Sequence, residues 1–207
     1  MDLGVSDKVA NLIIQVREMI QNEITPLNAE YFEEIGKHPS GDRFVLTDRQ
    51  VEIIDGLKAK AKERQLWNFW LTDSKLGYGL NTVEYAYLAE EMGKVGIAAE
   101  VFNCSAPDTG NMEVLERYGT QAHKDRWLGD LLEGKIRSAY VMTEPDIASS
   151  DAAQLSFEAK RDGDDFILNG EKWWISGAGD PRCALYILMA KTEPDALKHS
   201  RHTMFVM

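Results

Sequence analysis

The sequence predicts an α+β fold in which a bundle of helices precedes a small antiparallel β domain. Two observations support this prediction. Up to about Arg137 the apolar residues recur at helical spacing, and after Ser138 they alternate with polar residues as in strands. A run of helices followed by a run of strands is typical of segregated layers and not of alternating β-α-β units. We therefore expect a helical domain over residues 1–137 and an incomplete β domain over residues 138–207.

Two helices are expected in the first part of the chain. The first begins behind Ser6, a residue that can cap it, and Pro26 is expected to end it. The second opens at Thr47-Asp-Arg-Gln50, which has the form of a capping box. Their apolar stripes comprise Val9, Leu12, Ile13, Val16 and Ile20 in the first helix and Val51, Ile54, Leu57 and Ala61 in the second. Residues 36–44 lack periodicity and should form an exposed connection.

An aromatic cluster follows the second helix. It consists of Trp67, Phe69, Trp70 and Leu71. We interpret it as a core plug between helices and not as a base-stacking surface, because the acidic charge of the chain is wrong for a polyanion. Further helices are expected over residues 82–92, 111–118 and 121–133, with Gly119 and Gly134 as C-terminal stops.

The strand signal occupies the last third of the chain. Leu155, Phe157 and Ala159 alternate with polar neighbours, and turns are expected at Asp162-Gly163 and Asn169-Gly170. The β pattern continues through Phe166, Leu168, Trp174, Leu185, Ile187 and Met189. The apolar run Thr203 to Met207 ends the chain where a strand has just begun, so we expect a fragment or a truncated product.

Composition excludes several classes of function. The chain of 207 residues has 44% apolar residues and a formal net charge of -11, and it contains no block of Lys and Arg, so nucleic-acid binding is not expected. No stretch of about 18 apolar residues is present, so no membrane span is predicted. The four histidines are scattered without ligand spacing, and no metal site is predicted. No targeting signal is visible, which leaves the cytoplasm, mitochondria and peroxisomes as alternative locations.

Two motifs carry the chemistry of the chain. The first is Tyr140-Val-Met-Thr-Glu-Pro-Asp-Ile-Ala-Ser-Ser-Asp151, and the second is Lys172-Trp-Trp-Ile-Ser-Gly177. From the pattern alone, Tyr140, Met142 and Trp174 could form one buried face of a sheet, and Ser149 and Ser150 could be turn residues. A flavin site is the other interpretation, because an isoalloxazine ring needs an apolar wall and hydrogen-bond partners, while its pyrophosphate needs N–H or hydroxyl donors.

Both motifs, in register with the segments around Asn103 to Asn111, Tyr118-Gly119 and Leu131 to Gly134, resemble the acyl-CoA dehydrogenase family. The resemblance spans nearly the whole chain and is strongest to the branch typified by family members 10 and 11. Compared with the commoner Pro-Gly-Ala-Gly-Ser-Asp pattern of the family, this sequence has one extra residue and lacks both glycines.

The resemblance implies an FAD enzyme that forms the α,β double bond of acyl-CoA thioesters, with electron-transfer flavoprotein as acceptor and a homo-oligomer at full length. It implies flavin contacts from Tyr140, Met142, Thr143, Trp174, Ile175 and Ser176. It also implies a serine shared between flavin and acyl-CoA, which is Ser150 in the direct alignment, or Ser149 if the extra residue shifts the register.

The resemblance also implies that the catalytic carboxylate lies beyond residue 207, so no catalytic residue is assigned here. Glu144 is not a substitute base, because the resemblance places it in a turn. We therefore expect this chain alone to be inactive. Two alternatives remain open: a non-catalytic paralogue that acts as an interaction or oligomer partner, and an acyl-CoA oxidase.

Overall fold

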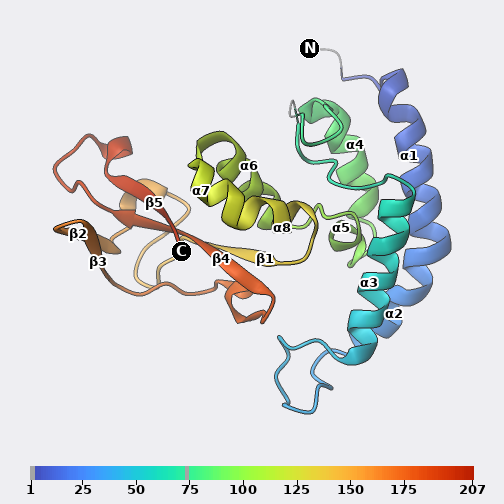
Figure 1. Cartoon of the computed structure of the whole chain (residues 1–207), viewed down its shortest axis with the longest axis horizontal. Coiled ribbons are helices and arrows are strands. Elements are labelled where there is room, and N and C mark those ends of the chain that lie inside the picture. The colour runs from blue at the N-terminus through green and yellow to red at the C-terminus, as the bar shows by residue number, and fades with distance from the viewer. Residues whose placement is uncertain (1–2, 73–74) are drawn as a thin grey trace. The chain divides into compact units, whose positions relative to one another are not determined.

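The computed structural model describes residues 3–72 and 75–207 (Figure 1). Contacts between residues divide the chain into two units, Met1–Thr109 and Gly110–Met207. The second unit joins the last helices to the sheet. The predicted domain boundary between residues 137 and 138 is a different division, placed at the change from helix to strand, and it stays a prediction.

The first unit is helical. Its elements are α1 (Asp7–Met19), the π-helical turn η1 (Ile20–Ile24), α2 (Thr25–Glu33), α3 (Asp48–Glu63), α4 (Thr82–Met92) and α5 (Ala98–Val101). The predicted caps are confirmed: the Ser6 side chain accepts from the Val9 N–H, and Thr47 and Gln50 form a complete capping box. A second capping box joins Asn81 and Glu84 at the start of α4.

Pro26 does not end the first helical run, and that prediction is wrong. The wide turn η1 carries the chain directly from α1 into α2, where Pro26 occupies the first turn. A first-turn residue has no N–H partner within its own helix, so the missing N–H of proline costs nothing there.

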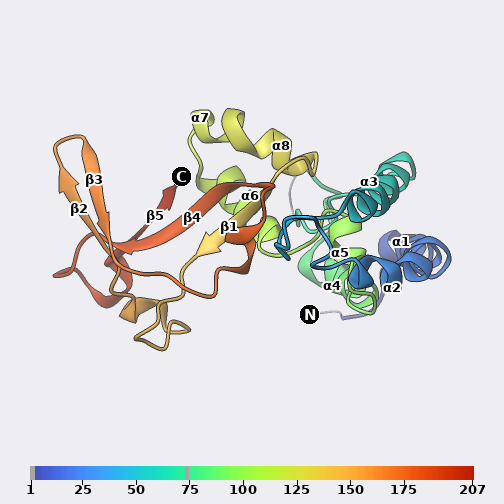
Figure 2. The same ribbon diagram turned by 90° about the horizontal axis from the view of Figure 1, so that it is seen from below.

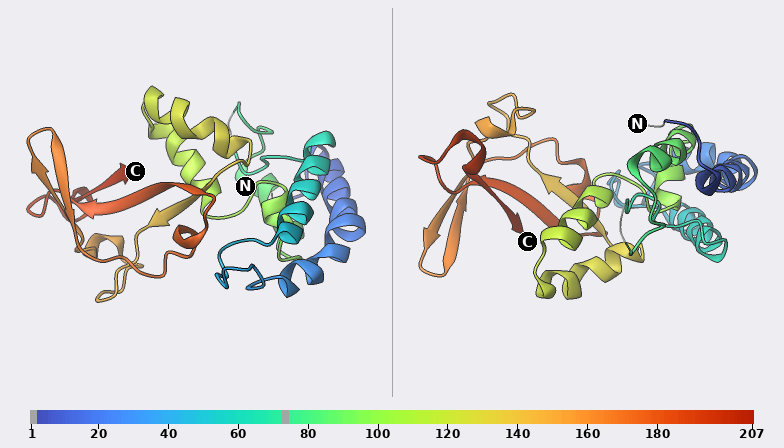
Figure 3. Two further views of the ribbon diagram at one scale, coloured as in Figure 1. Left: turned by 60° about the horizontal axis from the view of Figure 1, so that its bottom comes forward. Right: turned by 90° about the horizontal axis from the view of Figure 1, so that it is seen from above.

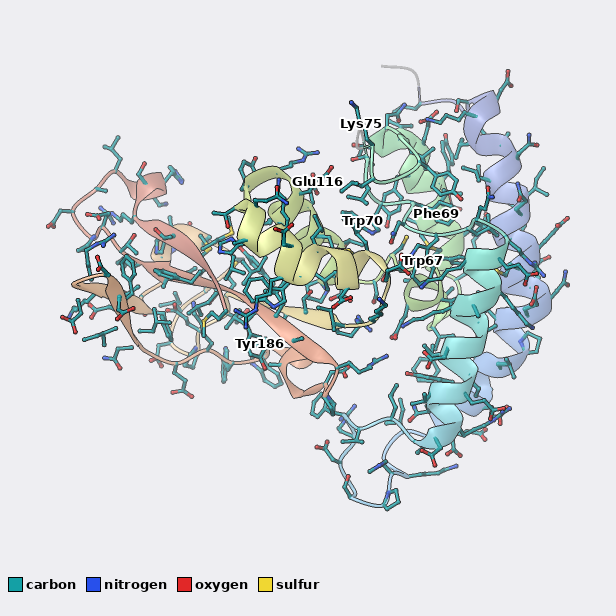
Figure 4. The ribbon with its side chains drawn as sticks, in the orientation of Figure 1. Trp67, Phe69, Trp70, Lys75, Glu116 and Tyr186 are labelled. Atoms are coloured by element: carbon teal, nitrogen blue, oxygen red, sulfur yellow. The ribbon has the colours of Figure 1, made fainter. Side chains whose placement is uncertain are left out.

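The aromatic cluster between α3 and α4 is a core plug, as predicted. Phe69, Trp70 and Leu71 are buried, and Trp67, in the segment that follows α3, is half-buried (Figure 4). Phe69 packs at 5.0 Å from the ring of Tyr78 and at 5.9 Å from that of Phe102, both between ring centroids. The plug therefore closes the apolar interior of the first unit.

The second unit begins inside α6, the first helix of a run that leads into the sheet. Its helices are α6 (Asp108–Tyr118), α7 (Gln121–His123), the π-helical turn η2 (Lys124–Leu128) and α8 (Gly129–Leu132), and Gly134 ends the run with a φ of 66° as predicted. The strands are β1 (Arg137–Val141), β2 (Glu158–Asp162), β3 (Asp165–Asn169), β4 (Cys183–Lys191) and β5 (His202–Val206). Three short 3-10 turns complete the unit, η3 (Ala152–Gln154), η4 (Ser176–Gly179) and η5 (Lys198–Ser200).

The sheet has the order β1-β4-β2-β3, with β5 also paired to β4 (Figure 2). The α+β class is confirmed, but the sheet is mixed and not antiparallel. Strand β1 runs parallel to β4, because the long connection between them allows the crossover that a parallel pair needs. The hairpin of β2 and β3, orange in Figure 3, turns at Gly163, which has a φ of 63°. The predicted turn is therefore confirmed.

The second motif is not a strand, which corrects the prediction for Trp174. Residues 171–175 have no regular secondary structure, and Ser176 begins η4. Trp174 has a φ of 55°, which no strand residue adopts. The alternation of apolar and polar residues in the sequence carries no sign of a left-handed backbone. The predicted strand was therefore extended through Trp174, where the extended backbone is in fact interrupted.

Candidate functional site

The two motifs lie side by side in the second unit. The Trp173 N–H donates to the Thr143 carbonyl over 3.0 Å. Further along, a Cβ placed on Gly177 would lie 3.1 Å from the Ser138 carbonyl oxygen, so a side chain at this position would crowd the first motif. Residues 173–177 therefore run antiparallel to residues 138–143. Strand β1 stands at one end of the strand order, so β4 pairs with only one of its two edges.

A buried ion pair joins the motifs. Lys172 Nζ lies 2.9 Å from Glu144 Oε1 and donates to the Met142 carbonyl over 2.8 Å. The two side chains are 6% and 3% exposed, respectively. Glu144 also accepts from the Ser156 N–H and hydroxyl, each over 2.7 Å, and from the Phe157 N–H over 2.9 Å. We call Glu144 and Lys172, with these hydrogen bonds, the clasp.

The clasp keeps both of its side chains charged. Burial raises the pKa of Glu144, but the hydrogen bonds from Ser156, Phe157 and Lys172 outweigh burial and hold this pKa at about 2. Burial lowers the pKa of Lys172, and Glu144 offsets part of that effect. Four donors therefore occupy the carboxylate oxygens of Glu144.

Sequence reasoning missed the clasp. The signal was present, since Glu144 and Lys172 are charged residues that stand among apolar and turn positions of the two motifs. A charge in such a place is stable only when it is paired. Nothing in the spacing shows, however, that two residues 28 positions apart meet.

An apolar cleft of about 560 Å³ opens beside the second motif. Its wall includes Val141 of β1, Tyr186 and Leu188 of β4, and Trp173, Trp174 and Ile175 of the motif. Figure 4 shows Tyr186 on β4. Trp173 is 42% exposed and Trp174 is 78% exposed, and their rings are 5.4 Å apart between centroids. The cleft thus offers an aromatic wall that the protein itself does not cover.

The predicted flavin residues divide between two places. Trp174 and Ile175 line the cleft, whereas Tyr140, Met142, Thr143 and the three serines are not part of its lining. Tyr140 alternates with Val141 along β1 and so lies on the other face of the sheet, where its hydroxyl is 3.7 Å from the sulfur of Met189. The structure thus brings the backbones of the motifs together but does not direct every predicted side chain into one space.

The predicted serines differ in what they contact. Ser149 is buried, and its hydroxyl accepts from the Glu144 N–H over 2.8 Å, so it closes the turn between residues 144 and 149. Ser150 is exposed, and within the described part of the chain its hydroxyl makes no hydrogen bond. Ser176 is also exposed, at the first position of η4. Ser150 and Ser176 can therefore offer a hydroxyl to a ligand, whereas the Ser149 hydroxyl serves the fold.

Two other kinds of site are absent from residues 3–72 and 75–207. Over these ranges no group of three or more His, Cys, Asp or Glu residues could hold a metal ion. No helix there has the length and apolar character needed to cross a membrane.

Comparison with known proteins identifies the two parts of the chain. Residues 6–135 match the model of the acyl-CoA dehydrogenase N-terminal domain, and residues 139–207 match that of the acyl-CoA dehydrogenase middle domain. Mouse acyl-CoA dehydrogenase family member 10 is 45% identical over 99% of this chain, and human family member 11 is 42% identical over 97%. The chain spans 19% and 25% of those two proteins.

Solved structures agree with this result. A Mycobacterium abscessus protein assigned to the acyl-CoA dehydrogenases is 46% identical, with a TM-score of 0.88 over 99% of this chain and 51% of its own. A glutaryl-CoA dehydrogenase of Mycobacterium smegmatis, solved in complex with FADH2, is 22% identical with a TM-score of 0.64 over 98% of this chain and 46% of its own. The second likeness concerns the fold alone. With both of its parts matched, the chain belongs to the acyl-CoA dehydrogenase family.

Proposed function

We propose that this chain is the flavin-holding part of an FAD-dependent acyl-CoA dehydrogenase. The observation that carries the proposal is the pairing of the two motifs, in which Trp173 donates to Thr143 beside the exposed indole of Trp174. An exposed aromatic ring next to an edge strand and to free hydroxyls supplies what a flavin needs: a flat wall, backbone groups and oxygen donors.

The residues present fit FAD in their chemistry. Trp174 would stack on the isoalloxazine, and Thr143, Ile175 and the backbone of β1 would contact its polar edge. Ser176 would donate to the flavin, and Ser150 would be the serine shared with the acyl-CoA, because Ser149 is already committed to its own turn. Tyr140 and Met142 would contribute through their backbone, since the Tyr140 side chain lies on the other face of the sheet. When bound, FAD supplies the acceptor for a hydride from the acyl-CoA.

We propose no catalytic base among these residues. A general base must reach the proton that it removes, and Glu144, the buried carboxylate beside the motifs, is held by four donors. We therefore propose that residues 1–207 alone bind FAD weakly and do not turn over acyl-CoA. In a longer protein we propose acyl-CoA as substrate, electron-transfer flavoprotein as acceptor and a homo-oligomeric assembly.

A titration with FAD tests this proposal. We expect FAD to quench the tryptophan fluorescence of the 207-residue protein with weak affinity, and Trp174→Ala to remove most of that quench. Addition of an acyl-CoA should leave the flavin absorbance unchanged. Absence of any FAD binding would contradict the flavin site. A stoichiometric flavin that bleaches with acyl-CoA would contradict the proposed inactivity.

The apolar cleft favours a second candidate function, that of a non-catalytic partner for other family members. Two apolar residues of its wall are exposed, Trp174 to 78% and Met207 to 49%. Co-expression with a full-length relative followed by size-exclusion chromatography tests this candidate. Mixed complexes that are lost on Trp174→Asp would support it, and separate elution of the two proteins would reject it.

A further inference from the structure

Trp174 has an unusual backbone conformation. Among the described residues, four residues other than glycine have a positive φ: Gln65, Asn68, Asn103 and Trp174. Asparagine tolerates the left-handed region, because its short side chain can bond locally, but a bulky aromatic residue there is strained. The φ of 55° at Trp174 therefore needs a structural cause.

Packing of the side chain does not supply that cause. Trp174 is 78% exposed, and its ring lies against that of the adjacent Trp173, at a tilt of 53°. A ring with so little burial gains too little from its neighbours to hold its own backbone in a strained state. The cause must lie in the residues on either side.

The backbone is fixed before and after Trp174. On one side, the Lys172 ammonium is held by the Met142 carbonyl and Glu144, and the Trp173 N–H is held by the Thr143 carbonyl. On the other side, the Ile175 carbonyl accepts from the Ala178 N–H over 3.0 Å at the start of η4. Trp174 therefore lies between two backbone segments that are both held by hydrogen bonds, and its own φ must adjust to connect them.

The clasp is the stronger of these anchors. Glu144 joins three segments, because it accepts from Ser156 and Phe157 as well as from Lys172, and its own N–H donates to Ser149. The Lys172 ammonium also lies 5.2 Å from the centroid of the Phe157 ring. A buried pair with this many hydrogen bonds allows little displacement of Lys172.

We propose that Glu144 and Lys172 are positioning residues that hold Trp174 in its left-handed conformation and thereby set its indole on the wall of the cleft. The aromatic wall is then in place before a ligand arrives, which reduces the ordering that binding requires. The claim that Glu144 and Lys172 position Trp174 depends only on the geometry described above. Only the identity of the ligand, an isoalloxazine ring, rests on the proposed function.

A pair of substitutions measures the strain directly. Trp174→Ala and Trp174→Gly both remove the exposed indole, but alanine keeps the Cβ that makes a positive φ costly. We expect the glycine variant to unfold at a temperature higher than the alanine variant by roughly 3 °C, the shift expected for strain of this kind in a chain of this length. Without strain the sign reverses, because glycine loses more chain entropy on folding.

The neighbouring residue provides a matched control. Trp173 is also exposed but has no positive φ. At this position the glycine variant should be the less stable of the pair. If glycine is no more stable than alanine at residue 174, the strain is absent and the proposal is overturned.

Breaking the clasp tests the cause of the strain. In a chain carrying Glu144→Gln and Lys172→Met, we expect the difference between the glycine and alanine variants at residue 174 to disappear, because the backbone can relax. Persistence of the full difference would overturn the proposal.

Should the double variant not fold, Ser156→Ala replaces it, since it removes one donor to Glu144 and leaves the ion pair. The difference should then shrink, and an unchanged difference would again contradict the proposal.

Binding of FAD separates this inference from the proposed function. We expect Trp174→Phe, which keeps an aromatic ring, to bind FAD nearly as the parent does, and Ser156→Ala to bind it several-fold more weakly with its ring intact. If the parent binds no FAD, the proposed function fails, while the comparison of glycine with alanine still decides the positioning.

Discussion

The two units of the chain use tryptophan in opposite ways. In the first unit Trp70 is 5% exposed and is buried together with Phe69 and Leu71. In the second unit Trp173 and Trp174 stand on the wall of an open cleft. The difference teaches that an aromatic cluster in a sequence identifies a large apolar surface but not what covers it. In one unit the fold covers that surface, and in the other it leaves the surface open.

The two units also use ion pairs differently. Arg17 and Glu91 join α1 to α4 in the first unit, and the Arg17 side chain is 48% exposed. Lys172 and Glu144 join the motifs in the second unit, and both are nearly inaccessible. An exposed partner can return to water when its pair is lost, whereas a buried one cannot.

Replacement of the buried tryptophan should have the largest effect on stability. We expect Trp70→Ala to lower the free energy of unfolding by about 3 to 5 kcal/mol, because it opens a cavity in the first unit. Trp174→Ala should change it by less than about 0.5 kcal/mol. Urea denaturation measures both values. Equal effects at the two positions would contradict the comparison.

Trp70→Phe sharpens this test. The Trp70 Nε1 group is a buried N–H that has no hydrogen-bond partner among residues 3–72 and 75–207. Its removal recovers part of the desolvation cost, so Trp70→Phe should be much less damaging than Trp70→Ala.

Loss of the clasp carboxylate should have the next largest effect. We expect Glu144→Gln to lower the free energy of unfolding by about 3 kcal/mol, because Lys172 stays buried without its counter-charge. Glu91→Gln should cost only about 1 kcal/mol, because Arg17 is half exposed. Chemical denaturation of both variants at pH 7 tests this ranking, and an equal cost would show that burial of the partner does not matter.

The pH dependence follows from the same carboxylate. The pKa of Glu144 is about 2 in the folded chain, below its usual value of 4.5, so the unfolded state binds the proton more readily. Its contribution to stability is complete above pH 4.5 and is lost as the pH falls from 4.5 towards 2, by up to about 1.4 kcal/mol per pH unit. Thermal unfolding across this range should be flatter for Glu144→Gln, and parallel curves would refute the assignment.

Removal of a helix cap should have the smallest effect on stability, and this effect should be similar in the two units. The Thr47 hydroxyl accepts from the Gln50 N–H in the first unit, and the Thr120 hydroxyl accepts from the His123 N–H in the second. We expect Thr47→Ala and Thr120→Ala each to cost about 1 kcal/mol, because a cap acts on its own first turn. Thermal unfolding measures this cost, with Thr47→Ser as a control that keeps the hydroxyl.

Local chemistry explains why much of the fold could be predicted. Ser6 and Thr47 cap helices, Gly134 ends one and Gly163 turns a hairpin, and each acts within a few residues of its own position. Pro26 misled the prediction, because the π-helical turn before it placed proline where its missing N–H does no harm. The parallel pairing of β1 with β4 was also missed, since strand direction depends on the path of the connection.

The candidate site was predicted in its motifs but not in its geometry. The sequence identified both segments, and the structure places them beside each other. Alternation suggested that Tyr140 and Trp174 share a face, but the left-handed backbone at Trp174 breaks the period. Whether these residues contact a flavin stays a prediction.

The amino-acid sequence was enough to predict the order of helices and strands, several caps and turns, and the family to which the chain belongs, because these depend on residues close together along the chain. The folded structure was needed to show which aromatic residues are covered, that Glu144 contacts Lys172, and that Trp174 has a left-handed backbone. Burial and charge pairing depend on what the folded chain brings together over long sequence distances, and no local pattern records that.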